Sequence, residues 1–133
     1  MRRMFSAFLF IIVLSSTFIF ASNPSEKDKL VVSQNTIQSL INGIESNNTG
    51  LKTSSAYMIG ELKITSAVIP LMEMMRNDDS EEARIVAALS LYKIGTPLAM
   101  NAVRQAIRFD RSERVKRMCL KFYNDYLNKS QGI

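Results

Sequence analysis

The chain has 133 residues, of which 47% are apolar, so it is long enough for one modest domain with its own hydrophobic core. It contains no histidine and one cysteine, which excludes an internal disulfide framework and leaves little support for a metal site. The formal net charge of +5 is unevenly placed, since residues 23–100 hold 7 basic and 9 acidic residues whereas residues 101–133 hold 8 basic and 3 acidic ones. Such asymmetry can direct a protein towards an acidic partner or surface.

Residues 1–22 are predicted to be a signal peptide. Arg2 and Arg3 precede a run of about 17 apolar residues, and small residues follow at the expected cleavage point. The alternative is an uncleaved membrane anchor, because a run of about this length is at the short limit for spanning a bilayer. We therefore expect export to the periplasm or the extracellular space, or else tethering to the membrane by this segment. Residues 23–29 are polar and contain a proline, which predicts a flexible extension.

Every periodic segment after this extension has the spacing of an α-helix. Ile37, Leu40, Ile41 and Ile44 lie at positions i, i+3, i+4 and i+7. The same spacing recurs near the C-terminus, at Val115, Met118, Cys119, Phe122 and Tyr126. No stretch alternates with period two, so we expect an all-α domain over residues 30–128, followed by a short tail at residues 129–133.

An internal repeat organises this domain. When the chain is shifted by 32 residues, Leu51-Lys52 falls on Ala83-Arg84 and then on Val115-Lys116, and small or apolar positions stay matched beyond them. The first unit joins the repeat with a slip of one residue, since Leu40 and Ile44 match Leu71 and Met75. The repeat predicts about three antiparallel helical hairpins stacked into a short α-solenoid.

Polar residues mark where these helices begin. Asp78-x-x-Glu81 and Asp110-x-x-Glu113 each offer an acceptor for unpaired backbone N–H groups and a carboxylate in the first turn, just before the second helix of a hairpin. Thr96-Pro97 has the residues expected at the start of the first helix of the last hairpin.

The second helix of the middle hairpin reads ARIVAALSLYKIG, from Ala83 to Gly95. Its order of a basic residue, two alanines, a small residue, leucine and a terminal isoleucine-glycine resembles the HEAT-repeat family, in particular the short HEAT-like repeats of the phycobilisome-lyase type. LKTSSAYMIGEL follows the same order from Leu51, whereas Tyr92 departs from it at a position where glycine is usual. Ankyrin and tetratricopeptide repeats fit less well, because neither the Thr-Pro-Leu opening at Thr96 nor a set of large aromatic positions recurs.

Charged residues recur at the same offset as the hairpins. Lys52, Arg84 and Lys116 form a basic column, and Asp78 and Asp110 form an acidic column at the turns before the same helices. The resemblance implies that these side chains pair along the stack as a structural ladder, which can fix the register of the hairpins while adding modest stability. Ligand binding by these residues is the alternative interpretation.

The last hairpin carries the candidate binding surface. Six cations lie there with few acids nearby, namely Arg104, Arg108, Arg111, Arg114, Arg117 and Lys121, and the last four follow one face of the last helix at three- and four-residue spacing. Such a patch would attract phosphate, lipid headgroups or an acidic protein, and the alternative is an ordinary solvated face of a terminal hairpin. Nucleic acid is not expected as a partner, because export would place the protein in the wrong compartment.

Catalysis and cofactor binding find little support in the sequence. Cys119 lies on an apolar stripe with no histidine to activate it, so a core position explains it better than a reactive thiol. The acidic run at residues 77–82 lacks the spacing of an EF-hand loop. We therefore predict no catalytic residue, cofactor or metal ligand.

The sequence favours an exported HEAT-like protein that binds another protein without catalysis. Its extended helical surface motivates this prediction. The alternative is a binder of anionic lipid or polymer surfaces through the basic last hairpin. A lyase-type enzyme is a third possibility, and no residue of the chain specifically supports it.

Overall fold

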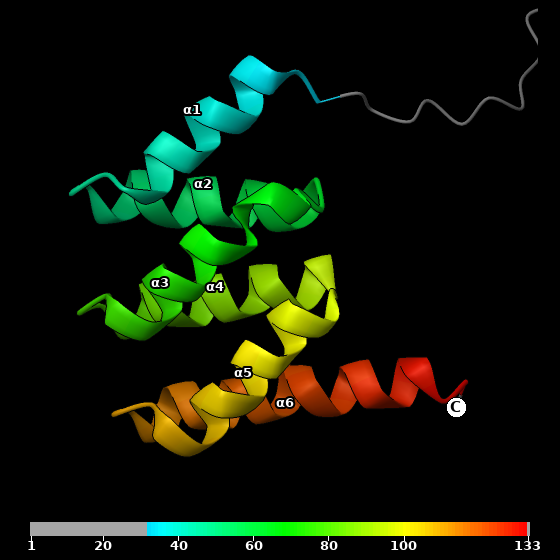
Figure 1. Ribbon diagram of the computed structural model, residues 1–133. Helices are drawn as coiled ribbons and strands as arrows, with labels where there is room; N and C mark the ends of the chain where they lie inside the picture. Colours follow the sequence, from blue (N-terminus) through cyan, green and yellow to red (C-terminus); the bar gives the residue numbers. More distant parts are fainter. Residues whose placement is uncertain (1–31, 133) are drawn as a thin grey trace, which may run out of the picture. The chain divides into compact units, whose positions relative to one another are not determined.

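The computed structural model describes residues 32–132, so the expected signal peptide at residues 1–22 and extension at residues 23–29 lie outside the described residues. The described part is helical throughout and contains no strand. None of its helices is long and apolar enough to cross a membrane. In chain order the elements are α1 (Gln34–Ile44), α2 (Thr49–Glu61), the short 3₁₀ helix η1 (Thr65–Ala67), α3 (Val68–Asn77), α4 (Glu81–Ile94), α5 (Pro97–Phe109) and α6 (Glu113–Ser130) (Figure 1).

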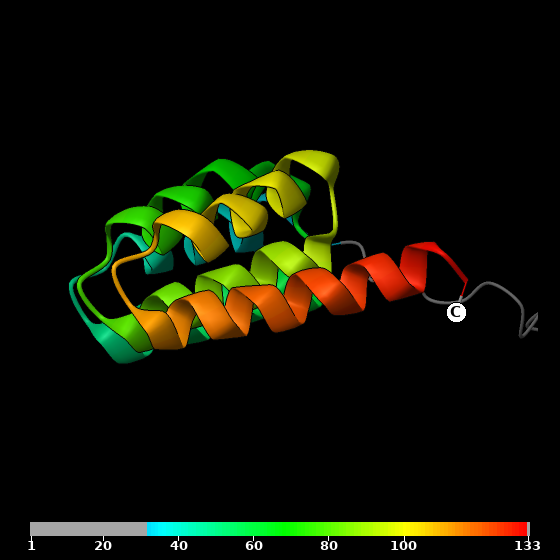
Figure 2. The same cartoon turned by 90° about the horizontal axis from the view of Figure 1, so that it is seen from below.

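The six α-helices form three antiparallel hairpins that stack side by side. Helices α1, α3 and α5 make one layer, and α2, α4 and α6 make the other (Figure 2). Helix α4 is at the centre, because it packs against α2, α3, α5 and α6. This arrangement confirms the all-helical fold and the short solenoid that the repeat predicts.

Side-chain caps explain where five of the helices begin. The residue before each helix has an extended backbone, and its side chain accepts the backbone N–H three residues later; these caps are Ser33, Asn48, Ser80, Thr96 and Ser112. Replacing such a cap by alanine typically costs about 1 kcal/mol. The predicted start of α5 is confirmed, with Thr96 as the cap and Pro97 in the first turn, where its missing N–H needs no partner.

The prediction that Asp78 and Asp110 supply the acceptors at the starts of α4 and α6 is wrong. Ser80 and Ser112 cap these helices, and each aspartate instead accepts the backbone N–H of its capping serine, at 2.9 Å for Asp78 and 2.7 Å for Asp110. The reason is the turn before each helix, in which the aspartate side chain accepts the backbone N–H two residues later. The serine at that position then supplies the side chain that caps the helix.

Small residues let α2 and α4 approach closely. Ala87, Ala88 and Ser90 of α4 are completely buried, and Ser90 lies against Gly60 of α2. A Cβ atom placed on Gly60 would lie only 2.8 Å from the Ser90 Cα atom. The Ser90 hydroxyl also donates to the Ala56 carbonyl at 2.7 Å, so its burial leaves no polar atom unpaired.

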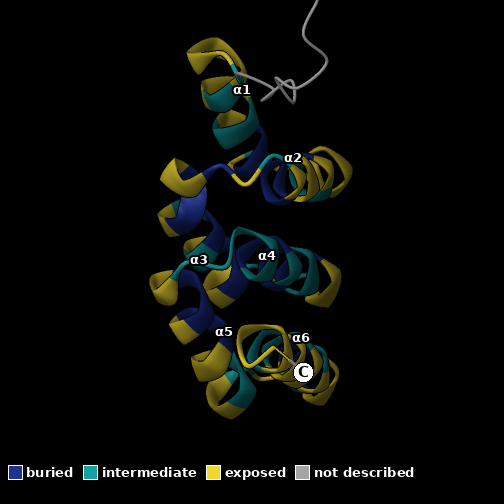
Figure 3. Cartoon of the chain, turned by 90° about the vertical axis from the view of Figure 1, so that its right-hand side faces the viewer, coloured by how far each residue is buried: buried dark blue, intermediate teal, exposed yellow. Residues whose placement is uncertain are grey.

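A left-handed glycine ends α4. Gly95 has a φ of 69°, a conformation that costs glycine little, and its N–H donates to the Leu91 carbonyl. Thr96 follows at once as the cap of α5, so only Gly95 lies between the last residue of α4, Ile94, and this cap. This tight connection sets α5 beside α3 in the first layer (Figure 3).

Candidate functional site

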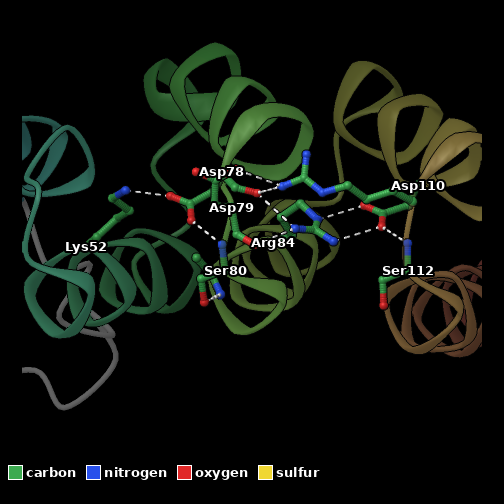
Figure 4. Close-up of polar contacts among 9 residues, drawn as sticks. Lys52, Asp78, Asp79, Ser80, Arg84, Asp110 and Ser112 are labelled. Atoms are coloured by element: carbon green, nitrogen blue, oxygen red, sulfur yellow. Dashed lines mark hydrogen bonds and ion pairs between the residues drawn. The ribbon is translucent and has the colours of Figure 1, made fainter.

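A buried arginine joins the second and third hairpins. The Arg84 guanidinium donates from Nε and Nη2 to the two carboxylate oxygens of Asp110, at 3.0 and 3.1 Å (Figure 4). Its Nη1 atom donates to the backbone carbonyls of Asp78 and Asp79, at 2.9 and 3.1 Å. The side chains of Arg84 and Asp110 are only 1% and 5% exposed, so this charge pair lies inside the domain.

A second pair of the same kind joins the first two hairpins. Lys52 of α2 forms an ion pair with Asp78 in the turn before α4, and both side chains are largely covered (Figure 4). Burial on its own would raise the pKa of Asp78. Hydrogen bonds from the Lys52 ammonium and the Ser80 backbone N–H, together with the charges of Lys52 and Arg84, outweigh that effect and leave the pKa below its ordinary value of 3.8.

Lys116 departs from the expected ladder. Its Nζ atom lies 2.9 Å from Oε1 of Glu113, three residues earlier in α6, and its hydrogen bond, followed by its charge, lowers the pKa of that carboxyl group. The ladder among the described residues therefore has two rungs, Lys52–Asp78 and Arg84–Asp110. Every fully buried side-chain polar atom in residues 32–132 has a hydrogen-bond partner.

The six cations of the last hairpin do not form the single surface that their spacing suggests. Arg111 donates to the Asp78 carbonyl at 2.7 Å and lies 3.3 Å from Asp79 Oδ1. Arg114 lies 3.9 Å from a carboxylate oxygen of Glu81. The expectation of few nearby acids is wrong for these two arginines, because the stacking brings acids of the preceding hairpin beside them.

The other four cations are divided between the two layers. Arg104 and Arg108 are exposed on α5, whereas Arg117 and Lys121 are exposed on α6. These two helices belong to different layers (Figure 2). Arg104 donates to the Asn101 side chain at 2.9 Å, and none of the four has an ion pair within residues 32–132. A partner that binds one layer would therefore meet only two of them.

Opposite charges at the repeat offset make contacts that the sequence interpretation missed. Glu61, Lys93 and Asp125 are spaced by 32 residues with alternating sign, and Lys93 pairs with Glu61 while also lying over the Tyr57 ring. Asp79 and Arg111 have the same spacing and also pair. An alternation of charge sign at the repeat offset was the signal that could have found these contacts.

An aromatic contact fixes α6 against α4. The rings of Tyr92 and Phe122 stack with centroids 5.7 Å apart. The Tyr92 hydroxyl donates to Asp125, and Lys129 donates to both residues. The hydrogen bond from Lys129, followed by that from Tyr92, lowers the pKa of Asp125, and these same contacts raise the pKa of Lys129. Tyr92 takes the place that Gly60 has in the preceding repeat, and its side chain contacts the last helix.

The outward side of the α2–α4–α6 layer is partly apolar. Ala83, Ala87 and Leu91 of α4 are buried, which places Ile85 and Leu89 on the opposite side of the helix, where they are half-buried. Tyr57 of the neighbouring α2 is 45% exposed. We call Tyr57, Ile85 and Leu89 the α4 face. Arg117 and Lys121 of α6 lie to one side of it and line a hollow of about 580 Å³ with Tyr92.

The chemistry of the described residues is limited. Burial, with a smaller effect of the Asp110 charge, raises the pKa of the Cys119 thiol to about 12, so the thiol is protonated at neutral pH. No group of three or more cysteine and acidic side chains in residues 32–132 is arranged to hold a metal ion.

Comparison with known proteins agrees with this architecture. A family model described as HEAT repeats matches residues 37–121, which extend from α1 into α6 and make up more than half of the chain. None of the curated proteins compared with the chain matches it. The matched region contains both rungs of the ladder and the α4 face, and the chain therefore belongs to the HEAT-repeat family.

Proposed function

We propose that this chain is an exported, non-catalytic HEAT-repeat module that binds another protein. HEAT repeats are generally protein-interaction modules, which supports the non-catalytic part of the proposal. The proposal of export rests on the basic and apolar pattern of residues 1–22. The mass of the protein isolated from its own cells tests that part directly, because cleavage would remove this segment.

The α4 face is the observation that carries the binding proposal. A surface helix of a globular protein normally has polar residues on its solvent side, and a helix with apolar residues around its whole circumference is normally buried. The middle of helix α4 approaches the second pattern, because Ile85 and Leu89 lie on its outward side, away from the buried Ala83, Ala87 and Leu91. The charged Glu82 and Lys93 lie on this side only towards the two ends of the helix. A partner protein that covers Leu89 and Tyr57 would complete its burial.

Crosslinking in the native organism, followed by mass spectrometry, tests this proposal. We expect the wild-type chain to crosslink reproducibly to one partner, and Leu89→Glu and Tyr57→Ser to lose that partner because each removes apolar contact area. Asn35→Glu, at an exposed position of α1, is the matched control and should keep the partner. Far-ultraviolet circular dichroism and thermal melting establish that each variant is folded. Crosslinks that persist in both α4-face variants would contradict the proposal.

Binding of an anionic lipid or polymer surface has weaker support. Arg111 and Arg114 are engaged by Asp79 and Glu81, and the other cations are split between the layers. The remaining candidates on α6 are Arg117 and Lys121. Binding to anionic vesicles that is lost when both are changed to glutamate would favour this function over protein binding.

A further inference from the structure

Two grooves occupy equivalent positions in successive repeats of the α1–α3–α5 layer. The first groove, of about 480 Å³, includes Ile44 and Glu45 at the end of α1 and reaches Pro70, Glu73 and Asn77 of α3. The second groove, of about 280 Å³, lies between α3 and α5 and is lined by Met75, Arg76, Ala102, Gln105, Ala106 and Phe109. Every lining residue of the second groove has a counterpart at the repeat offset in the first, with the one-residue slip of the first hairpin, and the first groove is lined in addition by Thr49, Lys52 and Asp79. The fold therefore creates both grooves, and the side chains decide what each can bind.

The second groove differs from the first in charge. Arg76 takes the place of Glu45, and Gln105 takes the place of Glu73. Asp110 is the acid that lines the second groove, and both of its oxygens accept hydrogen bonds from Arg84. The second groove is therefore cationic, whereas the first has acidic residues along it.

Two further arginines extend this positive charge along α5. Arg104 and Arg108 line an adjoining hollow of about 250 Å³ that shares Gln105 and Phe109 with the second groove. Within residues 32–132, no acid forms an ion pair with Arg76, Arg104 or Arg108. These guanidinium groups can therefore meet the carboxylates of a ligand without first breaking an ion pair of the described domain.

Phe109 supplies the apolar part of the same surface. It is the last residue of α5 and is 80% exposed, although it lies between the second groove and the adjoining hollow. Asn77 occupies the same position in the preceding hairpin, so the fold itself does not require an aromatic residue there. A large aromatic side chain that is exposed and surrounded by arginines is a common feature of interaction surfaces.

We infer that the second groove binds an acidic peptide segment of a partner protein. One large apolar side chain of the peptide lies against Phe109 and Met75, and neighbouring carboxylates pair with Arg76 and Arg108. The inference rests on the proposed function in one respect, since both take the ligand to be a protein. The binding surfaces are independent, because the groove belongs to the α1–α3–α5 layer and the α4 face to the α2–α4–α6 layer (Figure 3). Charge complementarity selects the acidic partner, and the exposed ring selects a peptide with an apolar anchor.

Fluorescence anisotropy with the purified full chain tests this inference. The probe is a short labelled peptide of glutamate, aspartate and serine with one central phenylalanine. We expect Phe109→Asn and Arg76→Glu each to weaken binding by about tenfold or more, because each removes part of a small contact surface. Binding should also weaken steeply as salt is added. Peptides with phenylalanine replaced by serine, or with the acids replaced by their amides, should bind more weakly than the probe.

Matched variants make the result specific to the groove. Arg117→Glu changes an exposed arginine of the other layer by the same charge and should leave the affinity for the probe unchanged. Phe109→Asn installs the residue of the preceding repeat and should melt at the wild-type temperature. Sedimentation of the wild-type chain and of this variant tests whether a second copy of the chain occupies the groove instead.

Several results would overturn the inference. These are failure of the probe to bind, equal affinity in Phe109→Asn and wild type, a larger effect of Arg117→Glu than of Arg76→Glu, or a dimer that Phe109→Asn abolishes. If the probe fails while native crosslinks remain sensitive to Leu89→Glu, this inference falls and the proposed function stands. If the probe binds while those crosslinks do not depend on the α4 face, this inference stands, and the α4 face is not the surface through which the proposed function is carried out.

Discussion

At the scale of single residues, Arg84 shows how a small helical domain tolerates a buried charge. Its guanidinium reaches both oxygens of Asp110 and the carbonyls of Asp78 and Asp79, so the charge is paired and the donors are used. Lys52 makes the equivalent contact to Asp78 at a more exposed position. The two rungs have the same place in the repeat and differ in burial, which makes them a natural comparison.

We predict that Arg84→Met lowers the free energy of unfolding by about 3–5 kcal/mol, because Asp110 stays buried without its partner. Lys52→Met, the matched change, should cost at most about 1 kcal/mol, since water can reach Asp78. Urea denaturation followed by circular dichroism measures both values. A double variant with Arg84→Met and Asp110→Leu should recover much of the loss. Equal losses in the two single variants would contradict this account of the ladder.

Asp78 makes the stability of the ladder depend on pH. Its pKa in the folded chain lies below the ordinary value of 3.8, because hydrogen bonds from Lys52 and Ser80 outweigh the effect of burial. The ionised carboxylate therefore stabilises the fold fully above the unfolded pKa, and this contribution is lost as the pH falls through the folded pKa.

We predict that the urea midpoint of Asp78→Asn falls less than that of wild type when the pH is lowered from neutral to below 3.8. The amide keeps an oxygen that can accept from Ser80 and has no proton to gain in this range. Comparison at neutral pH, where the wild type should be more stable, controls for the loss of the ion pair. Parallel acid dependence of the two proteins would show that Asp78 does not titrate as described.

At the scale of helices, α2 and α4 approach closely where Gly60 of α2 meets Ser90 of α4. We predict that Gly60→Ala destabilises the fold by about 1–3 kcal/mol, because its Cβ atom would force two backbones apart. This would happen although alanine is intrinsically the better helix former by about 1 kcal/mol. Ser54→Ala, at an exposed site of the same helix, should be close to neutral. A Gly60→Ala protein that melts like wild type would show that the helices can separate freely.

The repeat predicts the hairpins well because every unit of a solenoid meets the same packing environment. Ala87, Ala88 and Gly95 are needed for close approach and for ending a helix, and such requirements can be read from one chain. The caps were harder to predict, because Asp78 and Ser80 are both acceptors within one turn. Which of them meets the helix N–H depends on backbone angles that residue type does not fix.

The candidate surface was harder to predict than the fold. The spacing of Arg111 and Arg114 within the last hairpin does not point to Asp79 or Glu81, which belong to another hairpin and come near through stacking. Only a comparison of charges at the repeat offset points to the Asp79–Arg111 pair. Phe109 was also missed, because an aromatic residue at the end of an amphipathic helix is indistinguishable from a core residue until its exposure is known. The accessibility of side chains requires coordinates.

At the scale of the whole described domain, the two ends of the stack differ. Helix α1 buries only Gly43 and Ile44, and its packing contacts are with α2 and α3. Helix α6 buries Val115 and Cys119 and is also held by the Tyr92 stack. Since each hairpin of a solenoid is stabilised by its own core and by its neighbours, local opening should begin where both contributions are smallest.

We predict that amide hydrogens of α1 exchange faster than those of the other five α-helices, and that those of α4 exchange most slowly. Mass spectrometry of peptides from the full chain after brief exposure to deuterated water measures this order. Ile44→Ala, which removes the largest buried side chain of α1, should speed exchange in α1 while leaving α6 near its wild-type rate. Uniform protection across all six helices would mean that the hairpins open only together, and would contradict stepwise loss of order from α1.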